Sequence, residues 1–148
     1  MTLLEIFRGI GEMVKITEIP RTDYQFLLGD LIAGKNYLGL RYTGGVYFMV
    51  EVNPQPPHEI VYAGISSTVG ARLKSHVNVY KETKGYSVNY NPNMVYKLIT
   101  KFNFTLEDAQ EYLKGLTVLV ILEEDAVKRR EIEKFIINNY SPRYNLVR

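Results

Sequence analysis

The chain has 148 residues, of which 46% are hydrophobic, and its formal net charge is only +2. This length suits one compact domain, and this hydrophobic fraction excludes an intrinsically disordered chain. The lack of cysteine excludes disulfides, zinc–cysteine sites and thiol catalysis. The N-terminal apolar runs are too short and too charged for a membrane-spanning helix or a signal peptide, so we expect a cytoplasmic protein without membrane association.

Residues 1–44 are predicted to form a mostly helical N-terminal extension. Its clearest helix begins after Thr22, whose side chain suits an N-cap, and ends at Gly34. Between them, apolar side chains recur at helical spacing: Tyr24, Leu27, Leu28, Leu31 and Ile32. We expect this extension to pack on the domain that follows, residues 45–148.

From Gly45 the pattern changes to short strands. Residues 45–52 and 59–66 are rich in β-branched and aromatic side chains, and the proline-rich segment 53–58 separates them. This pattern predicts an antiparallel hairpin with a long loop. A helix over about residues 69–78 follows, capped by Ser67 or Thr68.

The second half of the chain predicts two helices, a strand and a final helix. The first helix covers residues 94–102, and Thr105 with Asp108 resembles a capping box that opens a second helix ending at Gly115. The unbroken apolar run at 116–124 predicts a central strand buried on both faces. A last helix over about residues 126–139 stops before Pro142. The predicted fold is α+β, with a small three-stranded antiparallel sheet flanked by helices in the order β-β-α-α-β-α.

Standard catalytic motifs are absent from the sequence, and the two histidines, His58 and His76, are too few for a histidine-rich metal site. Three groups of residues that could take part in catalysis remain. They are the strand tyrosines Tyr47 and Tyr62, the helical pair Arg72 and His76, and the acidic pair Glu131 and Glu133 with Asn145 beyond it.

Arg72 and His76 are four residues apart and therefore share a helix face, where both suit an anion. A carboxylate opposite them could hold a divalent cation, and a tyrosine beside a metal-bound water could accept a proton. Each group alone also has an ordinary structural explanation, because the chain has 12 tyrosines and charged pairs usually lie on solvated faces. Helical spacing does not choose between Glu131 and Glu133. The residues alone therefore indicate only a phosphate-handling α+β domain.

In order and spacing, these residues resemble the GIY-YIG nuclease family. The first signature corresponds to Gly45-Val46-Tyr47 and the second to Tyr62-Ala63-Gly64. The family's arginine lies ten residues beyond the second signature tyrosine, as Arg72 does, and its next polar position corresponds to His76. The family's glutamate lies nine residues before a proline, with an asparagine three further on. Glu133, Pro142 and Asn145 match this spacing, and Glu131 does not.

The resemblance implies divalent-metal-dependent cleavage of DNA to 5′-phosphate and 3′-hydroxyl ends. It implies that Glu133 ligates a single Mg²⁺ or Mn²⁺ and that Arg72 contacts the scissile phosphate. Tyr47 would accept the proton of the attacking water, assisted by Tyr62 and His76. Asn145 would support the site by hydrogen bonding, and Gly45 and Gly64 would permit a close approach or a turn of the strands.

Two segments carry most of the basic residues. Positions 72–101 hold six basic residues and one acidic one, and positions 126–148 hold six basic and two acidic ones. If they share a surface they would attract a polyanion, although charge alone favours an ordinary solvated surface. Given the resemblance, we expect duplex or branched DNA as the partner, contacted by Lys74, Lys81, Lys84, Arg129 and Arg130.

The resemblance leaves two matters open. Because little chain remains outside the nuclease-like domain, we expect either a homodimer or limited sequence specificity. The alternative function is a catalytically inactive module of the same fold that binds DNA or a protein. None of the matched catalytic positions is missing, which favours the active nuclease. The resemblance does not choose between a role in restriction, in homing, or in repair or recombination.

Overall fold

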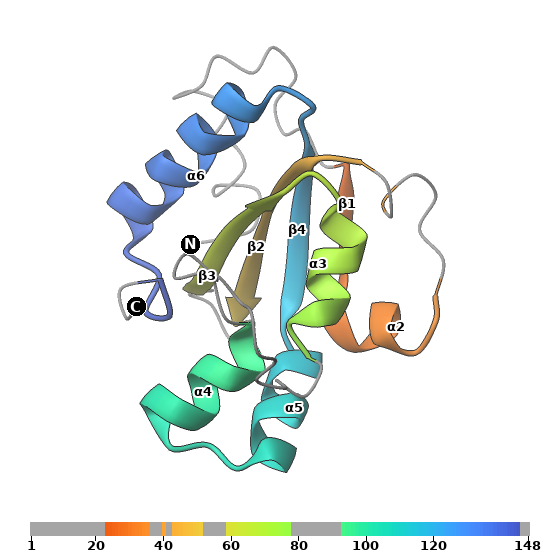
Figure 1. Cartoon of the computed structure of the whole chain (residues 1–148), viewed down its shortest axis with the longest axis vertical. Coiled ribbons are helices and arrows are strands. Elements are labelled where there is room, and N and C mark those ends of the chain that lie inside the picture. The colour runs from red at the N-terminus through yellow and green to blue at the C-terminus, as the bar shows by residue number, and fades with distance from the viewer. Residues whose placement is uncertain (1–22, 36–39, 41–42, 52–58, 78–92, 146–148) are drawn as a thin grey trace, which may run out of the picture.

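The computed structural model describes residues 23–35, 40, 43–51, 59–77 and 93–145. These residues build a four-stranded antiparallel sheet in the order β1-β4-β2-β3 (Figure 1). The strands are β1 (Tyr24–Leu27), β2 (Gly45–Glu51), β3 (Glu59–Ser66) and β4 (Thr117–Leu122). The helices are α2 (Leu28–Ile32), α3 (Val69–Ser75), α4 (Met94–Phe102), α5 (Leu106–Lys114) and α6 (Ala126–Tyr140). The α+β class is confirmed, but the prediction of three strands was wrong by one.

The additional strand is β1, which replaces the first half of the helix predicted after Thr22. Its residues pair with β4 from Tyr24 opposite Val120 to Leu27 opposite Thr117. Helical spacing gave the wrong element here because a short apolar run fits either a helix or a strand. The strand forms because the edge of β4 would otherwise have unpaired backbone groups. Only α2 remains of that helix, and Gly34 follows it with a φ of 100°, as expected of a helix stop. Thr22 lies outside the described residues.

The hairpin and the central strand follow the prediction. Strands β2 and β3 pair in antiparallel register, with Tyr47 opposite Gly64, and a bulge interrupts the register between Met49 and Val50. The predicted loop 53–58 lies outside the described residues. Strand β4 lies between β1 and β2, and its residues 118–121 are buried, as expected for a central strand.

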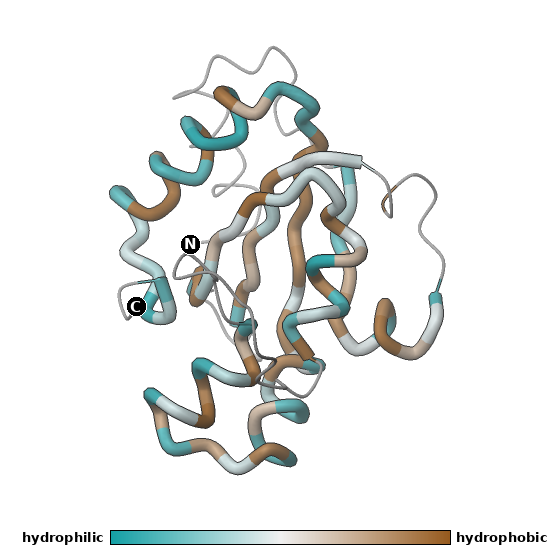
Figure 2. Tube along the Cα trace, in the orientation of Figure 1, coloured by the Kyte–Doolittle hydropathy of each residue, from teal (hydrophilic) through white to brown (hydrophobic). Residues whose placement is uncertain are grey.

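The sheet separates two hydrophobic layers because successive strand residues face opposite sides. On one side, Tyr47 and Met49 pack with residues of α2, α3, α4 and α5. On the other, Val46 and Phe48 pack with Ile132 and Ile136 of α6. Figure 2 shows the hydrophobic strands, and α6 alternating between hydrophilic and hydrophobic turns. Helices α3 and α6 therefore cover opposite faces of the sheet.

Helix ends in the second half follow from local capping. The Asn93 side chain accepts from the Tyr96 amide at 2.9 Å and opens α4, and the Thr105 hydroxyl accepts from the Asp108 amide at 3.1 Å and opens α5. The predicted bounds of α4 and the cap at Thr105 are confirmed. Helix α3 ends at Ser75, earlier than predicted, and Thr68 occupies its N-cap position without a side-chain capping bond.

Candidate active site

Three aromatic rings from separate elements meet on the α3 side of the sheet. Tyr47 comes from β2, Tyr62 from β3, and His76 from the C-cap position of α3. The ring centroids are 6.3 Å apart for Tyr47 and Tyr62, 5.7 Å for Tyr47 and His76, and 5.4 Å for Tyr62 and His76. All three residues are buried, His76 completely. The fold thus gathers three of the predicted site residues into one cluster.

The hydrogen bonds of His76 assign its proton. The Met94 amide donates to His76 Nδ1 at 3.1 Å, so Nδ1 must be an unprotonated acceptor. Burial, together with the positive charges of Arg72 and Lys97, holds the pKa of His76 well below its usual value of 6.5, so the ring is neutral. The single ring proton therefore lies on Nε2, which donates to the Tyr47 hydroxyl oxygen at 2.7 Å.

The N-terminus of α4 holds His76 in this orientation. The first amides of a helix lack partners within the helix and must find them elsewhere. Met94 donates to the imidazole, Val95 donates to the His76 carbonyl at 3.0 Å, and the Asn93 amide group donates to the Ser75 carbonyl at 2.9 Å. The start of α4 is thereby bound to the end of α3.

Charges from both layers of the protein act on the Tyr47 hydroxyl. Burial raises the pKa of Tyr47 well above its usual value of 10.0, and the neighbouring Tyr62 raises it further. The charge and a hydrogen bond of Arg72 lower this pKa, while the negative charge of Glu133 raises it. Arg72 on α3 and Glu133 on α6 are both half-buried, whereas Glu131 is exposed. Two predicted site residues from opposite faces of the sheet therefore lie close enough to influence the same hydroxyl.

Gly64 provides the space for the Tyr47 side chain. A Cβ atom on Gly64 would lie 2.4 Å from the Tyr47 hydroxyl oxygen and 2.5 Å from its Cζ. The ring therefore lies directly over Gly64 on the edge strand β3. Gly45 is similarly confined, because a Cβ there would lie 2.5 Å from the Ile121 carbonyl oxygen. Both glycines allow a close approach that a side chain would prevent.

Residues Pro142–Asn145, here called the C-terminal clasp, lie along β3. The Tyr144 amide donates to the Val61 carbonyl at 3.0 Å. The Asn145 side chain accepts from the Ala63 amide at 2.7 Å and donates to the Ala63 carbonyl at 2.8 Å. Asn145 thus holds the backbone of the residue between Tyr62 and Gly64, a supporting position rather than a place on the hydroxyl itself.

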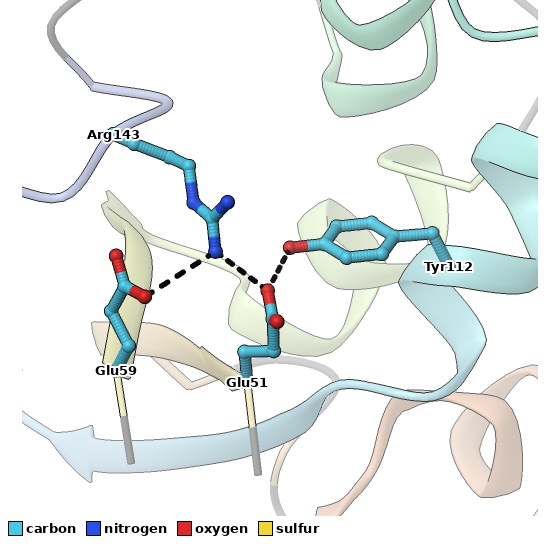
Figure 3. Close-up of polar contacts among 4 residues, drawn as sticks. All are labelled: Glu51, Glu59, Tyr112 and Arg143. Atoms are coloured by element: carbon cyan, nitrogen blue, oxygen red, sulfur yellow. Dashed lines mark hydrogen bonds and ion pairs between the residues drawn. The ribbon is translucent and has the colours of Figure 1, made fainter. Parts of the chain in front are cut away.

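Three further contacts of the clasp had no counterpart in the sequence predictions. Lys97 of α4 is only 8% exposed, and its ammonium donates to the Tyr144 carbonyl at 2.8 Å. Arg143 forms ion pairs with Glu51 at 2.7 Å and Glu59 at 3.4 Å, and the Tyr112 hydroxyl donates to Glu51 at 2.8 Å (Figure 3). The only local signal for Lys97 is its place three residues after Met94, which puts it on the same helix face as a core residue.

Among the described residues, the basic side chains predicted to contact DNA lie on helices that cover opposite faces of the sheet. Lys74 is exposed on α3 and Arg130 is exposed on α6. The Arg129 guanidinium donates hydrogen bonds to the carbonyls of Glu123 and Glu124 at 2.9 and 3.1 Å, so it is bound to the loop after β4. Lys81 and Lys84 lie outside the described residues.

The resemblance implies one protein ligand for the metal, Glu133. Among the described residues, no group of three or more histidine, cysteine, aspartate or glutamate side chains could hold an ion. Mg²⁺ commonly binds through one or two carboxylates, with water and substrate phosphate completing its shell. The half-buried Glu133, whose charge reaches the Tyr47 hydroxyl, is compatible with that kind of site.

Six residues of the predicted site come from β2, β3, α3, α6 and the C-terminal clasp: Tyr47, Tyr62, Arg72, His76, Glu133 and Asn145. Within the described part of the chain, no helix has both the length and the apolar character to cross a bilayer. The resemblance to the GIY-YIG nucleases stays a prediction from the order of these residues. Comparisons with protein-family models, curated proteins and solved structures find no match to this chain.

Proposed function

We propose that the chain is a cytoplasmic, divalent-metal-dependent DNA endonuclease of the GIY-YIG type. The proposed reaction hydrolyses phosphodiester bonds and leaves 5′-phosphate and 3′-hydroxyl ends. One observation carries the proposal: the Tyr47 hydroxyl accepts a hydrogen bond from His76 and lies within the influence of Arg72 and Glu133. An acceptor oxygen, a fixed cation and a carboxylate are the groups that attack on a phosphodiester requires.

In the proposed mechanism, Tyr47 first releases its own proton to solvent, a step that its burial makes costly, and the resulting phenolate oxygen accepts the proton of the attacking water. His76 cannot take that proton through Nε2, because this atom already carries one and Nδ1 is occupied by the Met94 amide. Hydrogen bonds from His76 and Arg72 to the Tyr47 oxygen instead stabilise negative charge on it. Arg72 also stabilises the charge that develops on the phosphate. Mg²⁺ or Mn²⁺ held by Glu133 would supply Lewis-acid stabilisation of the same charge.

The proposal is tested by cleavage of supercoiled plasmid and branched DNA with Mg²⁺ or Mn²⁺. Glu133→Gln removes the metal-binding charge, and Glu131→Gln on the same helix is its matched control. We expect the first variant to lose about 10²-fold or more of the cleavage rate, and the second to stay within about twofold of the original protein. The products should be ligatable without further treatment. Cleavage that survives EDTA, or equal losses in the two variants, would contradict the mechanism.

The near-complete burial of Tyr47, at 1% exposed, and of His76, at 0%, favours a second candidate function. In that function the same fold binds DNA, or a protein, without cutting. The outcome that selects it is a salt-dependent affinity for labelled duplex DNA with no cleavage under any metal condition. Gel filtration with and without DNA tests the proposed homodimer in the same samples.

A further inference from the structure

We propose that Lys97 is a positioning residue of the candidate site, which holds the C-terminal clasp on β3 and so keeps Tyr62 in place beside Tyr47 and Gly64 in place beneath it. The link to catalysis rests on the proposed nuclease function. The link to the clasp rests on the described contacts alone, so the two can be tested apart.

The surroundings of Lys97 argue against a merely solvated lysine. Lysine is rarely buried unless its charge is paired or hydrogen-bonded. Lys97 is 8% exposed, donates to the Tyr144 carbonyl at 2.8 Å, and lies 5.4 Å from the centroid of the Tyr62 ring. Neither partner belongs to α4. The ammonium therefore joins this helix to both the clasp and β3, where an apolar side chain could only fill space.

A continuous series of contacts leads from Lys97 to Tyr47. Lys97 holds the carbonyl of Tyr144, and the next residue, Asn145, holds both backbone groups of Ala63. Ala63 lies between Tyr62, which packs against His76, and Gly64, over which the Tyr47 ring lies. Displacement of the clasp would therefore shift the part of β3 on which the Tyr47 hydroxyl depends.

The other end of the clasp is held differently. Arg143 pairs with Glu51 and Glu59, but its side chain is 43% exposed, and exposed ion pairs hold a segment weakly. Lys97 adds a buried attachment to the hydrogen bonds that Tyr144 makes to Val61 and Asn145 makes to Ala63. We therefore expect loss of Lys97 to loosen the Tyr144–Asn145 end of the clasp.

The test compares Lys97→Met with Lys101→Met, which removes the same charge from an exposed position of α4. Hydrogen exchange of the Ala63 amide, which donates to Asn145, reports on the clasp, and exchange of the Val120 amide reports on the central strand. We expect Lys97→Met to accelerate exchange of the Ala63 amide about tenfold or more, and to leave the exchange rate of the Val120 amide within about twofold of that in the original protein. Lys101→Met should change neither. If Lys97→Met does not fold, Lys97→Gln takes its place and should also accelerate exchange of the Ala63 amide.

Steady-state cleavage of a duplex tests the catalytic consequence. Misplacement of a reacting group by about 1 Å can lower a rate about 10²-fold, so we expect Lys97→Met to lower kcat by about 10- to 100-fold with KM nearly unchanged. Equal acceleration at Ala63 and Val120 would show a general loss of stability and overturn the inference, as would an unchanged kcat. If the original protein cleaves no DNA, the proposed function fails on its own, and exchange at Ala63 still decides whether Lys97 holds the clasp.

Discussion

Replacement of Gly64 by alanine would place a methyl group where the Tyr47 side chain lies. The added Cβ would be 2.4 Å from the hydroxyl oxygen, 2.5 Å from Cζ and 3.0 Å from Cε2. Carbon atoms in contact prefer separations of about 3.5–4.0 Å, so the ring would have to retreat by about 1 Å. It has no free space for this, because Tyr47 is 1% exposed and packs against Tyr62 and His76.

Two costs follow from this displacement. Overpacking of a filled core destabilises a protein by about 1–3 kcal/mol. A retreat of about 1 Å would also break the 2.7 Å bond between Tyr47 and His76, and a buried polar group without a partner costs about 1–3 kcal/mol. We therefore expect Gly64→Ala to lower the free energy of unfolding by about 2–6 kcal/mol, a large share of an ordinary domain's stability.

The measurement is urea denaturation followed by circular dichroism, in a double-mutant cycle with Tyr47→Leu. Leucine ends before the clashing atoms, so in that background Gly64→Ala should cost less than about 1 kcal/mol. Gly115→Ala is the control, because its nearest neighbours would be 3.6 and 3.7 Å away, and it should shift stability by less than about 0.5 kcal/mol. The reasoning is refuted if Gly64→Ala costs no more than the control, or costs the same with leucine at position 47.

Three further expectations concern pH, capping and charge. The pKa of His76 is lowered in the fold, so as the pH falls the unfolded chain takes up this proton before the folded protein does. Below about pH 6.5, the free energy of unfolding of the original protein should therefore fall about 1.4 kcal/mol per pH unit more steeply than that of His76→Gln. Urea titrations at several pH values measure both slopes, and equal slopes would contradict this expectation. Thr105→Ala removes the cap of α5 and should cost about 1 kcal/mol, seen as a lower midpoint in thermal melts. Arg143→Met leaves Glu51 and Glu59 opposite each other and should cost up to about 1 kcal/mol, an effect that 1 M salt should reduce in the same melts.

Elements with local signals were predictable from the sequence. Helix α4 has the predicted bounds, and α5 begins at its Thr105 cap, because the residues that end these helices act within one turn. Strand β4 was predicted as central because both of its faces are apolar, a requirement of burial that any neighbouring strands would impose. The hairpin followed from two β-rich runs separated by prolines.

The position of β1 was not predictable in this way. Residues 24–27 carry the same apolar spacing whether they form a helical turn or a strand, and the deciding interaction lies far along the chain. That interaction is the pairing with residues 117–120 of β4, strengthened where Asp23 accepts from the Leu122 amide at 2.8 Å. A tertiary partner thus overrode a weak local preference.

The role of His76 shows the same limit within the candidate site. The spacing of Arg72 and His76 predicted a shared helix face, and both do act on Tyr47, but spacing alone cannot say which imidazole nitrogen holds the proton. That assignment depends on an amide of α4, 18 residues beyond His76. Because the N–H of this amide can only donate a hydrogen bond, Nδ1 must accept, and the ring proton is left on Nε2, which donates. Whether His76 acts as a donor or as a base is therefore decided by how α4 begins, and a change at its Asn93 cap would alter the chemistry of Tyr47 without touching either ring.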